Sequence, residues 1–117
     1  MSTSPSSSRL PDLDPSAAAE LLSRGDAWLL DVREPEEWRA GHAPQARHLP
    51  LSQVEPAAVD QDLPVIAVCR SGNRSGKAAD LLAAAGVRVH NLAGGMKAWA
   101  ADGRPVVTDD GQPGTVA

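Results

Sequence analysis

Short apolar runs alternate with helix-forming stretches along most of the chain. Two of these runs, 27–30 (AWLL) and 64–68 (PVIAV), are continuous and lead directly into polar residues. Continuous runs of this length are typical of strands buried on both faces. Two weaker runs, 46–49 and 87–92, predict further strands. We therefore expect an α/β domain with a mainly parallel sheet, in which ligands bind at the carboxyl ends of the strands.

Helices are predicted between these runs. Asp14 and Pro15 supply an N-cap and a first-turn proline for a helix that Gly25 ends. The other predicted helices span residues 34–39, 52–62, 77–85 and 96–101. In the third of these, Leu81 and Leu82 are expected on the inner face. The acidic residues that begin the first, Glu34, Glu36 and Glu37, suit a solvated helix start.

The length of 117 residues suits one folded domain, which we place at residues 10–104. Residues 1–9 are rich in serine and are expected to form a flexible lead. Residues 105–117 contain two prolines and two glycines, which predicts a short extended segment that ends in a frayed C-terminal tail.

Composition and charge exclude several classes of function. A net charge of −4 argues against a nucleic-acid partner and against a polybasic membrane surface. No apolar run approaches the ~20 residues that a membrane span needs. A single cysteine, Cys69, excludes an internal disulfide and a zinc site built on paired cysteines, so we expect no metal and no cofactor. Residues 1–15 carry no pattern of an export signal, which predicts a cytoplasmic protein.

The clearest chemical signal follows the strand at 64–68. Cys69 opens a short polar loop that contains Gly72 and leads into a helix, so successive backbone amides are expected to point at one spot. Arg70 and Arg74 add two cations, and a thiol in such a place should ionise below its usual pKa of ~8.5. A buried structural cysteine is the alternative interpretation, but a polar loop between arginines favours a reactive one.

Five segments of the chain, followed by a tryptophan, resemble the rhodanese homology domain, and in particular the single-domain sulfurtransferases. The resemblance rests on residues 30–38 (LDVREPEEW), 41–46 (GHAPQA), 48–50 (HLP), 69–75 (CRSGNRS) and 94–95 (GG), followed by Trp99. It covers residues 10–104 and implies a five-stranded, mainly parallel sheet flanked by helices, with a short edge strand near residues 10–13. Asp31 and Arg33 then resemble the pair of residues that braces the loops of the family.

The resemblance also implies a mechanism. Cys69 would take the outer sulfur of thiosulfate or of a persulfide donor, hold it as a persulfide, and pass it to cyanide or a thiol. Arg70 and Arg74 would hold the donor, and the loop residues Ser71, Gly72, Asn73 and Ser75 would supply hydrogen bonds. Ser75 has a second interpretation, as the N-cap of the following helix. Because Cys69 has no partner thiol in the chain, an outside thiol or protein is expected to accept the sulfur.

Two other functions stay open. Phosphatases and arsenate reductases also use a cysteine loop, with an arginine after five intervening residues. Here that position is Ser75 and the arginine is Arg74, so the ring of amides is tighter and suits one sulfur atom better than a phosphate. The other alternative is a binding module that keeps the fold without the chemistry, against which the cysteine and both arginines argue.

Overall fold

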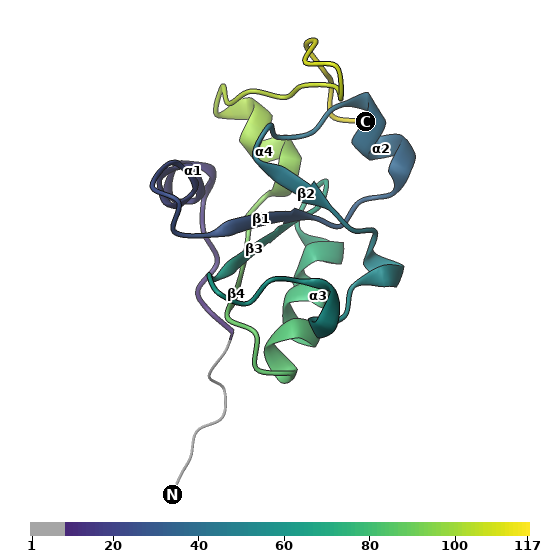
Figure 1. Ribbon diagram of the computed structural model, residues 1–117. Coiled ribbons are helices and arrows are strands. Elements are labelled where there is room, and N and C mark those ends of the chain that lie inside the picture. The colour runs from purple at the N-terminus through teal and green to yellow at the C-terminus, as the bar shows by residue number, and fades with distance from the viewer. Residues whose placement is uncertain (1–8) are drawn as a thin grey trace, which may run out of the picture.

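The computed structural model describes residues 9–117 and shows a parallel sheet flanked by helices (Figure 1). All but one residue of the predicted N-terminal lead lie outside the described residues. The strands are β1 (Trp28–Asp31), β2 (Ala46–His48), β3 (Val65–Val68) and β4 (Val89–Asn91). The helices are α1 (Pro15–Ser23), α2 (Pro35–Ala40), α3 (Asn73–Ala84) and α4 (Gly95–Ala101), with 3₁₀ turns η1 (Leu51–Gln53) and η2 (Pro56–Ala58). The predicted α/β class is confirmed.

The four strands are all parallel in the order β2-β1-β3-β4, which places β3 in the interior of the sheet. All four residues of β3 are buried, as its continuous apolar sequence predicts. Helices α1 and α4 pack on one face, around Ile66 and the fully buried Trp99. Helix α3 packs on the other, where Leu82 meets Val65 and Ala67. The carboxyl ends of β1, β3 and β4 therefore meet at one edge between the helical layers.

The fifth strand expected near residues 10–13 does not form in the part of the chain that the structure describes. Within the described residues, 10–13 lie beside β4 but make only isolated bridges, Arg9 with Val89 and Leu13 with Leu92. The physical reason is Pro11, which has no N–H to donate to a ladder and whose carbonyl accepts instead from the His90 ring, at 2.7 Å. Among residues 9–117 the sheet therefore has four strands, with a short, irregular border at the expected edge.

Two helix predictions need correction. The helix expected at 52–62 is replaced by η1 and η2, because Pro56 and the flanking extended residues interrupt it. Helix α3 begins at Asn73, four residues earlier than expected, because Gly72 adopts a left-handed conformation (φ +113°) and serves as its N-cap. The longer helix buries Leu82 but leaves Leu81 46% exposed, so only one of the two leucines faces the core.

The C-terminal residues fold back onto the domain instead of fraying. Val107 pairs antiparallel with His42, and the Thr115 amide donates to the Ala40 carbonyl at 2.9 Å. Val116 packs against the core on the α1 and α4 face. Figure 1 shows the C-terminus beside α2. The last residue, Ala117, accepts a hydrogen bond from Arg70 at 3.0 Å, so this segment reaches the loop that begins at Cys69. Among residues 9–117, the helices are all too short or too polar to cross a membrane.

Candidate active site

Cys69 follows the last residue of β3, at the edge where three strands end. Cys69 is only 1% exposed, whereas the next two residues of its loop, Arg70 and Ser71, are exposed. The loop turns at Gly72 and continues directly into α3, whose first turn carries Arg74 and Ser75. The sequence-predicted residues 69–75 are thus brought together by one tight connection between a buried strand and a helix of 12 residues.

Hydrogen-bond donors converge on the sulfur of Cys69. The Gly72 amide donates to Sγ at 3.1 Å, and the Ser75 hydroxyl lies 3.3 Å from it. Burial raises the pKa of the Cys69 thiol, but hydrogen bonds from the Ser75 hydroxyl and from the amides of Ser75, Gly72 and Ser71 outweigh it, so that pKa lies below its ordinary value. The arrangement stabilises a thiolate, which is the nucleophilic form of cysteine.

Ser75 is the third helical residue of α3 and not its N-cap, so the N-cap interpretation is wrong. The one proton of its hydroxyl is shared between two acceptors, Cys69 Sγ at 3.3 Å and Asn91 Oδ1 at 2.6 Å, and Asn91 Nδ2 donates to the Gly72 carbonyl at 3.2 Å. Asn91 thereby ties the turn of the loop to the first turn of α3. Sequence reasoning did not identify this residue. The available signal was its place at the end of the predicted strand 87–92.

The pH dependence of Cys69 alkylation tests the role of the Ser75 hydroxyl. In Ser75→Ala the thiolate loses a donor, so the pKa of the thiol should rise by about one to two pH units, the scale of one hydrogen bond to a charge. The midpoint of the rate of reaction with iodoacetamide should move to higher pH, and the rate at pH 7 should fall. Ser71→Ala is the control. Ser71 donates to the Cys69 sulfur through its backbone amide, which alanine keeps, so the midpoint should stay at the wild-type pH. Equal midpoints in Ser75→Ala and the wild type would remove the hydroxyl from this role.

The two arginines of the loop differ in their partners. Arg74 forms two hydrogen bonds to the Glu37 carboxylate, at 2.6 and 2.9 Å, which link α3 to α2. The hydrogen bonds from Arg74 lower the pKa of Glu37 to about 2, so this carboxylate is ionised at neutral pH. Arg70 is exposed, and its Nε donates to the backbone oxygen of Ala117 at 3.0 Å. Glu37 was expected to be part of a solvated helix start, and its pairing across two elements was not visible in the sequence.

Gly95 determines how closely α4 approaches the loop. A Cβ atom on Gly95 would lie 2.4 Å from the Cys69 carbonyl oxygen and 2.5 Å from that of Arg70, and its φ of +61° also favours glycine. The approach lets the amides of Met96 and Lys97 donate to the same two carbonyls, at 2.8 and 3.0 Å. Residues 94–95 therefore lie against the Cys69 loop.

Asp31 and Arg33 form a fully buried ion pair next to the site. Arg33 donates from Nε and Nη2 to the Asp31 carboxylate at 2.9 to 3.1 Å, and from Nη2 to the Gly41 carbonyl at 2.7 Å. These bonds hold the end of β1 to the turn after α2, which fits a bracing role.

No group of three His, Cys, Asp or Glu side chains suited to a metal ion occurs in residues 9–117.

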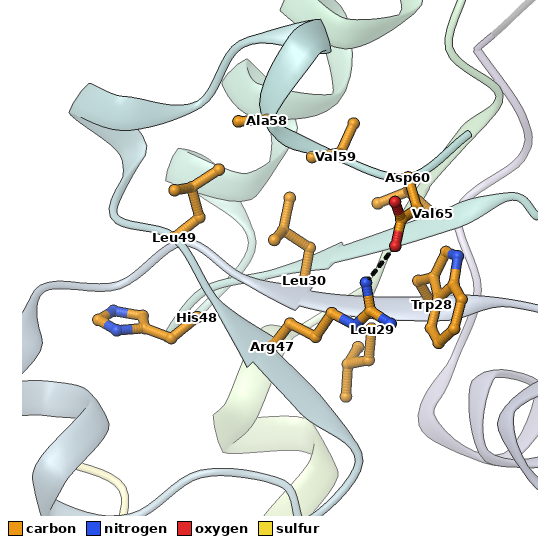
Figure 2. Close-up of a pocket in the computed structure, with 10 residues that line it drawn as sticks. All are labelled: Trp28, Leu29, Leu30, Arg47, His48, Leu49, Ala58, Val59, Asp60 and Val65. Atoms are coloured by element: carbon orange, nitrogen blue, oxygen red, sulfur yellow. Dashed lines mark hydrogen bonds and ion pairs between the residues drawn. The ribbon is translucent and has the colours of Figure 1, made fainter. Parts of the chain in front are cut away.

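A separate hollow of about 200 Å³ lies on the α3 side of the sheet, toward β2 (Figure 2). Arg47 crosses it, 3.7 Å above the Trp28 ring and 2.6 Å from the Asp60 carboxylate. Leu30, Leu49 and Val59 make much of its apolar lining. The residues that line it include none from the Cys69 loop. The hollow is therefore distinct from the candidate active site.

Comparisons with known proteins agree with this geometry. The sequence profile of the rhodanese-like domain matches residues 14–102. A sulfurtransferase of Allochromatium vinosum is 38% identical over 99 residues, which cover 82% of this chain and 92% of that protein. The uncharacterized protein YqhL of Bacillus subtilis is 43% identical over 76 residues, which cover 62% of this chain but only 60% of that protein.

A solved structure of similar fold extends the comparison. The crystal structure of a rhodanese-related protein from Thermoplasma volcanium superimposes with a TM-score of 0.79 at 26% identity. The match covers 86% of this chain and 100% of that one.

Proposed function

The chain belongs to the rhodanese-like domain family, and on that premise we propose that it is a sulfurtransferase that carries a sulfane sulfur on Cys69. The observation that carries the proposal is the convergence of amide and hydroxyl donors on Cys69 Sγ at the start of α3. The name of the Allochromatium vinosum relative supports the same class of reaction.

The proposed reaction has two steps. The Cys69 thiolate attacks the outer sulfur of thiosulfate, a sulfur–sulfur bond forms, and the bond to the sulfonate sulfur breaks with release of sulfite. With a persulfide donor the leaving group is a thiolate instead. An acceptor, cyanide or a thiol, then attacks the outer sulfur of the Cys69 persulfide and restores the thiolate. Each step transfers a sulfur atom without a proton abstraction, so no general base is required.

The loop suits both anionic states of Cys69. Its amides and the Ser75 hydroxyl are donors fixed by α3 and by Asn91, so they need little rearrangement when charge moves from the inner to the outer sulfur. Arg70, exposed at the rim of the loop, is the proposed contact for the oxygens of an incoming donor. Ser71 and Asn73 are exposed beside it and complete the proposed binding surface. The acceptor is proposed to be an outside thiol or a protein.

The test is the intact mass of the protein after incubation with thiosulfate. We expect a gain of one sulfur atom, which disappears when cyanide is added and appears as thiocyanate. If the protein gains no sulfur but hydrolyses an aryl phosphate, the phosphatase alternative replaces this proposal. If it does neither while Cys69 is reduced, the protein is a binding module. The pairing of Arg74 with Glu37 disfavours the phosphatase, because that reaction would need the arginine free to hold phosphate.

A further inference from the structure

We infer that Glu37 is a specificity-determining residue, which makes the site favour sulfur donors of low negative charge, such as alkyl persulfides, over the thiosulfate dianion. This inference rests on the proposed function, because it concerns the donor of the same reaction. It differs from the expectation that both arginines of the loop are free to bind an oxyanion.

The first support is the geometry of the Glu37–Arg74 pair. Both carboxylate oxygens of Glu37 are engaged, at 2.6 and 2.9 Å from the two terminal nitrogens of Arg74. The Glu37 side chain is 19% exposed and that of Arg74 is 33% exposed, so the pair is partly screened from solvent. A two-point contact of this kind occupies the edge of the Arg74 guanidinium, with both terminal nitrogens, that a sulfonate would otherwise use.

The second support is the balance of charge around the loop. Glu37 is ionised at neutral pH because Arg74 lowers its pKa to about 2, so the pair carries no net charge. Glu34, on the same helix start, adds a further carboxylate close enough to act on Arg74. Of the loop's two cations, Arg70 pairs with no Asp or Glu side chain of residues 9–117, and its Nε donates to the backbone oxygen of Ala117. A dianion that approaches the Cys69 thiolate therefore meets less compensating charge than the sequence suggests.

A comparison of two sulfur donors of similar shape but different charge tests the effect of charge apart from that of size. Thiosulfate is a dianion, and methanethiosulfonate is a monoanion in which a methyl group replaces one oxygen. Attack by the Cys69 thiolate gives the same persulfide from both, with sulfite as the leaving group in the first case and methanesulfinate in the second. The measured quantity is the ratio of kcat/KM for methanethiosulfonate to kcat/KM for thiosulfate.

Glu37→Gln removes the negative charge while a glutamine at this third helical position can still accept from the Glu34 amide, as Glu37 does at 3.0 Å. The positive charge of Arg74 is then no longer offset by Glu37, and the ratio should shift about tenfold toward thiosulfate, mainly through a lower KM for thiosulfate. Glu36→Gln is the matched control, because this exposed neighbour has the same charge and makes no ion pair within residues 9–117. It should leave the ratio near the wild-type value.

Arg74→Gln tests the inference independently. It removes the positive charge, leaves Glu37 charged, and should move the ratio away from thiosulfate. The double variant Glu37→Gln/Arg74→Gln removes both charges and should return the ratio close to that of the wild type. A double variant that keeps the full shift of Glu37→Gln would contradict the inference, and so would an equal shift in Glu36→Gln. If neither donor places a sulfur on Cys69 of the wild type, the proposed function fails instead. Loading of sulfur on the wild type with an unchanged ratio in Glu37→Gln overturns the inference alone.

Discussion

Cys69→Ser should lose sulfur loading from thiosulfate and thiocyanate formation from cyanide, each by more than about 10³-fold, the scale on which removal of a covalent nucleophile acts. A serine hydroxyl is almost fully protonated at neutral pH and has little affinity for sulfur, whereas the Cys69 thiol has a pKa below its ordinary value. Intact mass after thiosulfate treatment measures the loading, and a colorimetric assay of thiocyanate measures turnover.

The substitution is close to isosteric, so a loss of activity can be separated from a loss of fold. The Gly72 amide that points at Sγ can point at a serine oxygen as well. A urea unfolding curve of Cys69→Ser serves as the control and should resemble that of the wild type. Since Cys69 is the one cysteine of the sequence, a sulfur adduct that persists in the variant would contradict the assignment of the nucleophile.

Arg33→Leu should destabilise the domain by about 3–5 kcal/mol, the range found when one member of a buried ion pair is removed. Arg33 and Asp31 are both fully buried, and the Asp31 carboxylate would keep only the backbone amide of residue 33 as a donor. Domains of this size are stable by about 5–15 kcal/mol, so the loss is a large share of the total. The midpoint and slope of urea unfolding measure it.

Two further variants define what the Arg33→Leu result means. Arg24→Leu removes an arginine that is 57% exposed and paired with Asp26, and should change stability by less than about 1 kcal/mol. A double variant that also replaces Asp31 with leucine should recover part of the loss, because the unpaired buried charge is gone. A similar loss in Arg33→Leu and Arg24→Leu would show that the buried pair has no special role.

The local sequence predicted the main strands well because their signals are contained within a few residues. The run at 64–68 is apolar at every position, and its strand β3 is buried along its whole length. Helix α1 begins as predicted, because Asp14 accepts a hydrogen bond from the Ala17 amide at 2.8 Å. The start of α3 was placed too late, since glycine in a left-handed conformation can cap a helix without a polar side chain.

The polar loop of residues 69–75 between a strand and a helix, and its resemblance to a family loop, located the candidate site, but the partners of that loop come from elsewhere in the chain. Asn91 lies 16 residues beyond Ser75 and meets it because β4 runs beside β3. Glu37 reaches Arg74 across 37 residues, from a helix start that looks solvated in isolation. Residues 105–117 were expected to form a frayed tail, but contacts with α2 and the core hold them in place. These partners, too, are distant in the sequence.

The sequence by itself therefore determined the α/β class, the strand that delivers Cys69 and the loop that receives it, because periodicity, glycine and proline act over a few residues. The tertiary structure decided which donors reach the sulfur, how closely Gly95 approaches the loop, and that Arg74 is paired with Glu37. Those contacts join residues that are far apart along the chain, and their energies depend on distance and burial, which only the folded sheet and its helices set.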